Sequence, residues 1–268
     1  MKLRAFSGSV LTDKPAVSGS IRECLIVDDD ELTRTVLACQ LGSLGVTVRQ
    51  AGEARQALSI WSEWRPAAVL IDCVMPGQDG YVLARRIRQI ERGIRPAVST
   101  LLIGVSGHTG RSHVARCEGV GMDAVLGKPA STQTFAAMLG LTQLTQTVPQ
   151  PHADDDAARA RELQYLYVSS CESDLQLIEQ GLRQWRAQGV SFHAHRIEGA
   201  SRVVGANDVA AAARALYDAV AQGRTMPVLQ ASCARLSSAF AAWRRAPHAP
   251  AAAGIAPRAG ALVYESAV

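Results

Sequence analysis

Little in this sequence is typical of a membrane, secreted or nucleic-acid-binding protein. No apolar run approaches the roughly 18 residues that a membrane-spanning helix requires. The first 20 residues, MKLRAFSGSVLTDKPAVSGS, lack the uninterrupted apolar stretch of a signal peptide. The formal net charge is only +4 at pH 7, and the basic residues are scattered along the chain. We therefore expect a cytoplasmic protein with no nucleic-acid partner and no membrane partner.

The six cysteines lack the regular spacing of a zinc site or a disulfide framework. The chain has no CxxC pair, and the intervals between cysteines are long and irregular: Cys24, Cys39, Cys73, Cys117, Cys171 and Cys233. This spacing argues against both kinds of site. It predicts buried, reduced thiols in a cytosolic protein.

Short apolar runs alternate with helical patterns between residues 21 and 140. The runs LIV, AVLI and LLIGV carry no charged residue, as is typical of strands in a parallel sheet that is covered on both faces. The segments between the runs, such as GYVLARRIRQIERG, have the period of amphipathic helices. We therefore expect an α/β domain with a doubly wound, five-stranded parallel sheet over residues 21–140, after an N-terminal extension at residues 1–20.

The strand patterns stop after residue 140. Residues 141–155, LTQLTQTVPQPHADD, lose the periodicity and predict a linker. Beyond the linker, three segments each place their apolar residues on one helical face: Leu175, Ile178, Leu182 and Trp185; Val209, Ala213, Leu216 and Val220; Leu229, Cys233, Leu236, Phe240 and Trp243. These segments predict an all-α helical bundle over residues 156–245. The Ala/Pro/Gly-rich tail at residues 246–268 is expected to be disordered.

Polar residues follow four of the predicted strands. LIV is followed by Asp28, Asp29 and Asp30, AAVLI by Asp72, LLIGV by Ser106, and DAVLG by Lys128. Because the carboxyl ends of parallel strands meet at one edge of a sheet, we expect these groups to lie close together. Close carboxylates repel one another, and a hard divalent cation such as Mg²⁺ stabilises them. The sequence therefore predicts a magnesium site that acts on a phosphoryl group.

Phosphoryl transfer needs a nucleophile in line with the bond that breaks, and fixed positive charge near the phosphoryl oxygens. Asp72 can be the nucleophile, Mg²⁺ and Lys128 the positive charge, and Ser106 a hydrogen-bond donor. The chain holds only three lysines, Lys2, Lys14 and Lys128. A lysine at position 128 therefore suggests that a compact ammonium group is needed there, where a guanidinium would not serve.

The motifs LIVDDD, VLIDCVMPGQDG, LLIGVSG and LGKPAS resemble, in their order and spacing, the receiver domain of two-component response regulators. The resemblance covers residues 21–140 and implies a flavodoxin-like fold. It also implies a role for each polar residue: Mg²⁺ is held by Asp28, Asp29 and Asp72, Asp72 accepts the phosphoryl group, Ser106 is the switch hydroxyl, Lys128 contacts the phosphoryl oxygens, and the Lys128–Pro129 peptide bond is cis.

Three positions depart from this family. Val125 stands where the family usually has a switch aromatic, which puts the usual coupling between the hydroxyl and the aromatic in doubt. Val74 and His108 occupy the positions two residues after the acceptor and two residues after the switch hydroxyl. In the family, those positions tune the lifetime of the phosphoryl group.

The stretch HAHRIEGASRVVGA, residues 193–206, places a glycine four residues after a histidine. On a helix, one face carries Ala194, Ile197, Ser201 and Val204, and the opposite face carries His195, Glu198, Gly199 and Arg202. We expect the first face to be packed and the His195 imidazole to face solvent. Gly199 then leaves the ring open to a docking partner's active site. His193 and His195 project in different directions and cannot share a metal ion, so His193 has no assigned role.

The stretch AHRIEGASRVVGA resembles the histidine phosphotransfer domain, a four-helix bundle, over about residues 156–245. The resemblance implies that His195 is a phosphoacceptor. Glu198 stands where the family usually has lysine, and Arg196 or Arg202 could supply the missing cationic contact. A receiver followed by such a bundle is similar to the C-terminal end of hybrid sensor kinases.

Two functions stay open. In the first, a sensor histidine kinase phosphorylates Asp72, the group passes to His195, and a downstream response regulator takes it. In the second, the receiver is a phosphorylation-dependent switch or adaptor that binds a partner protein, and the bundle transfers nothing. No Gly-rich nucleotide-binding segment of a kinase is present. We therefore expect a phosphotransfer protein and not an ATP-dependent enzyme.

Overall fold

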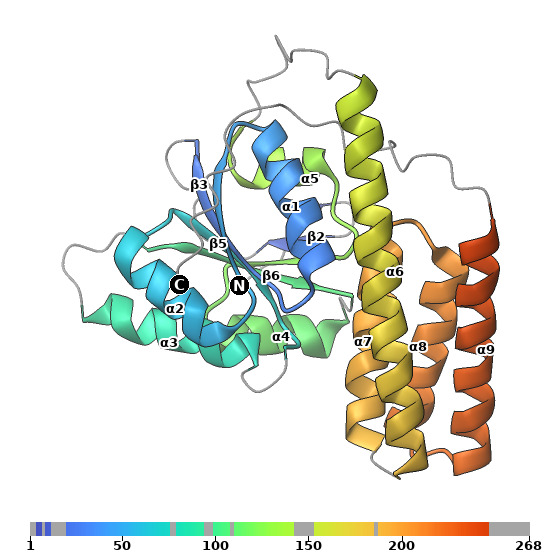
Figure 1. Ribbon diagram of the computed structural model, residues 1–268. Helices are drawn as coiled ribbons and strands as arrows, with labels where there is room; N and C mark the ends of the chain where they lie inside the picture. The colour runs from blue at the N-terminus through green and yellow to red at the C-terminus, as the bar shows by residue number, and fades with distance from the viewer. Residues whose placement is uncertain are drawn as a thin grey trace. The chain divides into compact units, whose positions relative to one another are not determined.

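The structure is a computed structural model that describes residues 4–6, 9–11, 20–75, 79–93, 99–107, 110–141, 153–184 and 187–246. This chain divides into two compact units, one built on a β-sheet and one built from four helices (Figure 1). The tail expected at residues 247–268 lies outside the described residues. Residues 142–152 of the expected linker, His108 and Trp185 lie outside them as well.

The sheet of the first unit has the strand order β1-β2-β7-β6-β5-β3-β4. Its strands are β1 (Arg4–Phe6), β2 (Ser9–Leu11), β3 (Glu23–Val27), β4 (Thr47–Ala51), β5 (Ala68–Asp72), β6 (Leu101–Ser106) and β7 (Ala124–Gly127). The strands from β3 to β7 are parallel to their neighbours. The expected five-stranded parallel sheet is therefore confirmed.

The N-terminal extension adds two strands to this sheet that the sequence did not predict. Strand β2 pairs antiparallel with β1 on one side and with β7 on the other. Each of the two strands is only three residues long, which is too short to show the alternation by which a strand is recognised.

Helices cover both faces of the sheet, which confirms the doubly wound arrangement. Their bounds are α1 (Glu31–Ser43), α2 (Ala54–Trp64), α3 (Gly80–Arg92), α4 (Arg111–Gly119) and α5 (Thr132–Met138). In β3, Cys24 and Ile26 belong to the core that α1 and α5 cover. Leu25 and Val27 belong to the core that α2, α3 and α4 cover. Neighbouring strand residues therefore point to opposite faces of the sheet. The helices cover these two faces, and the polar groups lie at the carboxyl edge.

Side-chain caps fix the start of helices that follow the sheet. The N–H of Thr33 donates to Asp30 Oδ1 at 2.8 Å at the start of α1, and the N–H of Tyr81 donates to Asp79 Oδ1 at 3.1 Å at the start of α3. Such caps satisfy backbone donors that the first helical turn leaves unpaired. The cap on α1 follows Asp28 and Asp29 directly, so helix α1 begins where the acidic residues leave the sheet.

The second unit is a bundle of α6 (Ala153–Arg183), α7 (Ala187–Val203), α8 (Asn207–Ala221) and α9 (Met226–Arg245). Gly205 and Gly223 connect successive helices with φ angles of +73° and +64°. This left-handed conformation favours glycine, which carries no Cβ, and it commonly ends a helix. Helix α6 begins at Ala153, slightly inside the stretch that we expected as linker.

The interior of the bundle holds apolar residues from all four helices: Tyr167, Ile178, Val190, Ile197, Val209, Leu216, Leu229, Leu236 and Phe240. Tyr167 of α6 joins two neighbours, because its ring lies edge-on to Trp243 with centroids 4.5 Å apart and its hydroxyl is 2.8 Å from Ser201 Oγ. The expected apolar faces are buried, except that Val220 and Trp243 are half-buried. The predicted four-helix bundle is confirmed. Among the residues that the structure describes, no helix has both the length and the apolar character of a membrane span.

Candidate functional site

Carboxylates and one ammonium group meet at the carboxyl edge of the parallel sheet, as the sequence predicts. Asp28 follows β3, Asp72 is the last residue of β5, and Lys128 follows β7. Lys128 Nζ donates to Asp28 Oδ2 at 2.7 Å and to Asp72 Oδ2 at 2.8 Å. Carboxylate oxygens of Asp28, Asp29 and Asp72 lie within 4.8 Å of one another. Three strands therefore deliver one compact charged site.

The site combines three carboxylates with the ammonium group of Lys128. Burial alone lowers the pKa of Lys128, but the nearby charges of Asp28 and Asp72 raise it above its ordinary value. Lys128 is therefore a cation at neutral pH. Carboxylate oxygens at this spacing are the ligands that a hard divalent cation prefers. The acidic cluster could bind a metal ion, and its donor set fits Mg²⁺.

The chain around Asp72 holds its side chain in place. The N–H of Val74 donates to Asp72 Oδ1 at 3.0 Å, while Lys128 occupies Oδ2. A Cβ atom on Gly80 would lie 2.0 Å from the carbonyl oxygen of Asp72. Helix α3 therefore approaches the end of β5 more closely than any side chain at position 80 allows.

The remaining receiver residues lie where the sequence places them. Ser106 is the buried last residue of β6, and its carbonyl oxygen accepts a hydrogen bond from the N–H of Lys128 at 2.8 Å. The Lys128–Pro129 peptide bond is cis, as the resemblance implies. Val125 lies within β7 and is buried in the core, so the position of the missing switch aromatic is filled by a core aliphatic.

The face of α7 that carries His195 is not exposed, which corrects the expectation that the imidazole faces solvent. His195 is only 9% exposed, and Glu198 is 0% exposed. The ring of His195 packs beside Tyr217 of α8 with centroids 5.8 Å apart, and its Nδ1 lies 4.0 Å from Glu198 Oε2. The opposite face is also buried, with Ala194, Ile197 and Ser201. The prediction assumed one packed face, whereas α7 packs against two neighbouring helices.

Carboxylates inside the bundle pair with the cationic residues near His195. Arg196 Nε donates to Asp174 Oδ2 at 3.1 Å, and Arg202 Nη2 donates to Glu198 Oε1 at 2.7 Å. His193, which had no assigned role, lies with its Nδ1 2.8 Å from Asp174 Oδ1. The two arginines that could replace the usual lysine are therefore both engaged with carboxylates of the bundle.

Sequence reasoning missed the contribution of α8 to this site. Arg214 Nη1 lies 3.7 Å from Glu198 Oε2, and Tyr217 lies against the His195 ring. Burial raises the pKa of Glu198 above its ordinary value. The positive charges of Arg202 and Arg214 act in the opposite direction but do not cancel this rise. No motif marks Arg214 or Tyr217, because only the packing of α8 on α7 brings them to the histidine.

Comparison with known families gives two matches. Residues 24–140 match the response regulator receiver domain, and residues 162–246 match the Hpt domain. Neither matched family is a kinase catalytic domain.

Curated relatives match all or part of this chain. The virulence sensor protein BvgS of Bordetella parapertussis is 31% identical over 282 residues, which cover 91% of this chain and 22% of the relative. The sensor histidine kinase RcsC of Salmonella typhimurium is 35% identical over 130 residues, covering 48% of this chain and 13% of the relative. The chain thus spans about a fifth or less of the length of these relatives.

Solved structures similar to this chain include a receiver domain and a chemotaxis protein. The receiver domain of the histidine kinase CKI1 from Arabidopsis thaliana, complexed with Mg²⁺ and BeF3⁻, is 29% identical with a TM-score of 0.40, covering 44% of this chain and 87% of that chain. The chemotaxis protein CheY4 of Vibrio cholerae is 22% identical with a TM-score of 0.41, covering 45% of this chain and 98% of that chain. From the family matches, the chain belongs to the two-component signalling proteins and combines a response regulator receiver domain with an Hpt domain.

Proposed function

We propose that this protein is a phosphorelay intermediate that accepts a phosphoryl group on Asp72 and passes it through His195 to a downstream response regulator. A sensor histidine kinase is the proposed donor. The observation that carries the proposal is the Asp72 carboxylate, held by Lys128 at 2.8 Å within a cluster of three carboxylates. The presence of a receiver and an Hpt domain in one chain supports a phosphorelay role.

The first transfer is proposed to occur at the carboxyl edge of the sheet. A carboxylate oxygen of Asp72 attacks the phosphorus of the kinase's phosphohistidine, the P–N bond breaks, and the kinase imidazole leaves. Asp28, Asp29 and Asp72 would hold Mg²⁺, which when bound supplies positive charge to the phosphoryl oxygens. Lys128, now shared between two carboxylates, donates to a phosphoryl oxygen, and Ser106 donates a hydroxyl hydrogen bond.

The second transfer is proposed to occur on α7. A ring nitrogen of His195 attacks the phosphorus on Asp72, the P–O bond breaks, and the Asp72 carboxylate is regenerated. Because Nδ1 is the ring nitrogen near Glu198 Oε2, we propose Nε2 as the attacking atom. Both phosphorylated forms are high in energy, so the transfer can run in either direction. The proposed working units are residues 21–140 and 156–245, joined by a linker at 141–155.

Two observations favour the second function, a switch or adaptor whose bundle transfers nothing. His195 is only 9% exposed. One helical turn later, the buried Glu198 replaces the lysine that is usual in the family. A phosphoacceptor must be reached by a partner's active site. If the ring stays covered in solution, the receiver acts alone by changing its binding to a partner.

Phosphotransfer by the full chain decides between these functions. A cognate kinase with labelled ATP is mixed with the wild type, Asp72→Asn, His195→Ala and, as a matched control, His193→Ala. We expect the wild type and His193→Ala to carry acid-labile phosphohistidine and base-labile acyl phosphate. His195→Ala should carry only acyl phosphate. Asp72→Asn should carry neither with the kinase, yet accept phosphoryl on His195 from a phosphorylated response regulator.

Two outcomes contradict the relay. A wild-type chain that never carries acid-labile, base-stable phosphohistidine would remove His195 from the pathway. A bundle that stays inert to every donor, while Asp72 is phosphorylated normally, would establish the adaptor.

A further inference from the structure

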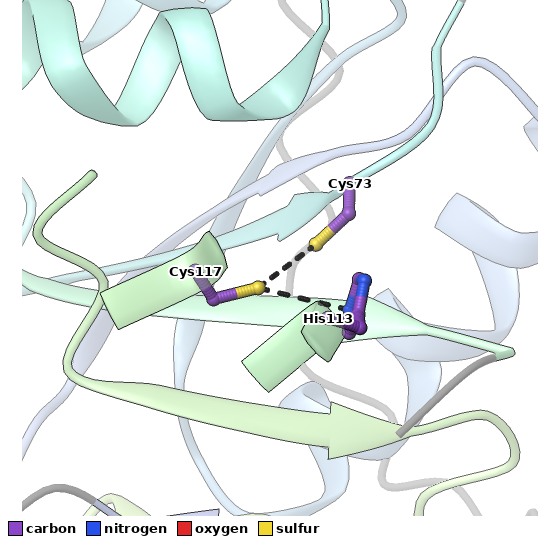
Figure 2. A group of neighbouring side chains, drawn as sticks. All are labelled: Cys73, His113 and Cys117. Atoms are coloured by element: carbon purple, nitrogen blue, oxygen red, sulfur yellow. Dashed lines mark hydrogen bonds between the residues drawn. The ribbon is translucent and has the colours of Figure 1, made fainter. Parts of the chain in front are cut away.

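Two thiols and an imidazole form a second cluster in the receiver unit, beside the acidic site. Cys73 directly follows β5, and His113 and Cys117 lie one turn apart on α4, with their side chains pointing toward one another (Figure 2). Cys73 Sγ lies 3.8 Å from Cys117 Sγ, and Cys117 Sγ lies 3.7 Å from His113 Nε2. All three potential ligand atoms lie within 4.8 Å of one another.

These separations match the dimensions of a tetrahedral zinc centre. With Zn–S bonds of about 2.3 Å and Zn–N bonds of about 2.0 Å, two sulfur ligands lie about 3.8 Å apart and a sulfur and a nitrogen about 3.5 Å apart. The observed Sγ–Sγ and Sγ–Nε2 distances are 3.8 Å and 3.7 Å. Two of the three separations therefore fit one ion as they stand, and the third, between Cys73 and His113, is within 4.8 Å.

The orientation of the imidazole is a second, independent observation. The hydroxyl of Tyr81, at the start of α3, lies 2.7 Å from His113 Nδ1. This contact turns the other ring nitrogen, Nε2, toward Cys117. A metal-binding histidine normally makes such a hydrogen bond through its second nitrogen, which fixes both the ring and the tautomer. Thiol packing alone does not require it.

The surroundings of the cluster favour a soft ion. A Cβ atom on Gly104 of β6 would lie 2.9 Å from Met122 Sδ, 3.1 Å from Cys73 Sγ and 3.5 Å from Cys117 Sγ. The missing side chain at position 104 thus leaves room for three sulfur atoms. Sulfur-rich sites select thiophilic ions such as Zn²⁺ over Mg²⁺.

The access to the cluster is compatible with binding. Cys73 and Cys117 are buried, whereas His113 is half-buried and gives the cluster a side that reaches solvent. Metal ions bind the thiolate form of cysteine, so each thiol gives up its proton when the ion binds.

We propose that Cys73, His113 and Cys117 bind a thiophilic metal ion, with the dimensions of Zn²⁺, and leave a fourth coordination position open. Each thiol that binds releases its remaining proton to solvent, and Nε2 contributes its lone pair while Nδ1–H donates to Tyr81. The site is distinct from the Mg²⁺ site, and its existence does not depend on the phosphorelay. Because two ligands lie on α4 and the third follows Asp72, a bound ion would tie α4 to the acceptor loop.

Metal titration of the full chain tests this proposal. The reduced protein is titrated with Co²⁺ in excess Mg²⁺, which fills the acidic cluster, and then with Zn²⁺ against a chromophoric chelator. We expect one equivalent of Co²⁺ to give a thiolate-to-cobalt charge-transfer band in the near ultraviolet and the strong visible bands of a four-coordinate ion. Zn²⁺ should abolish both. Cys73→Ser and Cys117→Ser should lose the charge-transfer intensity, while the half-buried Cys39→Ser is the matched thiol control and should behave as the wild type.

Tyr81→Phe keeps all three ligands, so it separates metal binding from folding. Removing the hydrogen bond to His113 Nδ1 should weaken zinc binding about 10–100-fold while the cobalt bands remain. Circular dichroism verifies that each variant is folded. If a serine variant does not fold, the two single variants Tyr81→Phe and His113→Gln test the metal site in its place. The proposal is overturned if wild type shows only a weak six-coordinate spectrum. It is overturned equally if the bands survive in Cys117→Ser or in a folded His113→Gln.

Discussion

At the scale of single residues, Lys128 controls the charge of the acidic site. Its ammonium group contacts both Asp28 and Asp72, so it competes with a metal ion for the same carboxylates. Lys128→Met should slow phosphorylation of Asp72 by about 100- to 1,000-fold, since one preorganised donor to the phosphoryl group is lost. The same variant should bind Mg²⁺ more tightly, because the competing cation is gone.

Two measurements check this expectation. The rate of phosphorylation is followed with a small phosphodonor, and Mg²⁺ binding is followed by the rise in thermal stability that the ion produces. Arg22→Met, at an exposed position before β3, is the control for a lost positive charge. Unchanged phosphorylation in Lys128→Met would remove this residue from the proposed mechanism.

Glu198 is the residue whose titration should be visible in the stability of the bundle. Burial raises its pKa from 4.5, so the folded state holds this proton to a higher pH than the unfolded state does. Stability is therefore lost as the pH rises from 4.5 through the folded-state pKa. Glu198→Gln lacks this loss. Its stability relative to the wild type should increase over that interval by about 1.4 kcal/mol for each unit by which folding raises the pKa.

Hydrogen exchange of α7 and α8 peptides, measured from pH 4 to about 8, gives this difference. Glu172→Gln is the matched control, because Glu172 makes an exposed ion pair with Arg244. A stability difference for Glu198→Gln that does not change with pH would show that this carboxyl titrates normally.

At the scale of secondary-structure elements, the contact between β5 and α3 positions Asp72, the proposed acceptor. A Cβ atom on Gly80 would lie 2.0 Å from the Asp72 carbonyl oxygen and 2.9 Å from Ile71 Cγ2. Gly80→Ala should therefore lower the free energy of unfolding by about 3 kcal/mol or more, because a backbone atom has to move. Phosphorylation of Asp72 should fall as well.

A second glycine provides the comparison. Gly42 lies in α1 with no atom within 4 Å of its Cβ position, so Gly42→Ala should stabilise the protein by up to about 1 kcal/mol. Urea unfolding of both variants measures the two effects. If Gly80→Ala were as mild as Gly42→Ala, the close approach of α3 to β5 would be wrong.

The elements differ in how well the sequence predicts them. Strands β3, β5 and β6 are predictable because each is an apolar run that ends in a polar residue of the site. Strands β1 and β2 are not, since three residues carry too little pattern. For α7, the sequence predicted one buried face, whereas the structure also buries the face that carries His195. The buried part of a helix depends on how many other helices pack against it, and the sequence pattern does not show that number.

At the scale of the whole molecule, each unit has a hydrophobic core of its own. Ile103 lies in the core of the sheet, and Leu236 lies inside the bundle. Ile103→Ala and Leu236→Ala should each cost about 2–5 kcal/mol, but only in the unit that contains the substitution. Hydrogen exchange at increasing urea concentrations, measured separately for peptides from β6 and α9, gives the loss of stability in each unit. Equal destabilisation of both peptides by either variant would show that the chain unfolds as one cooperative unit.

The acidic site was predictable from sequence, whereas the other two sites depended on packing. Asp28, Asp72 and Lys128 each follow a strand, and parallel strands bring their carboxyl ends to one edge whatever the details of packing. The surroundings of His195 depend on how α8 lies on α7, which supplies Tyr217 and Arg214. The sequence spacing argued against a zinc site.

Spacing along the sequence does not register the thiol cluster, because the cluster joins residues far apart in the chain. Cys73 follows β5, while His113 and Cys117 lie on α4. The sequence alone determined the two folds and the acidic edge, since periodicity and strand ends are local properties of the chain. Only the tertiary structure decided which side chains from separate elements meet, because distances between elements are set by packing and not by spacing along the sequence.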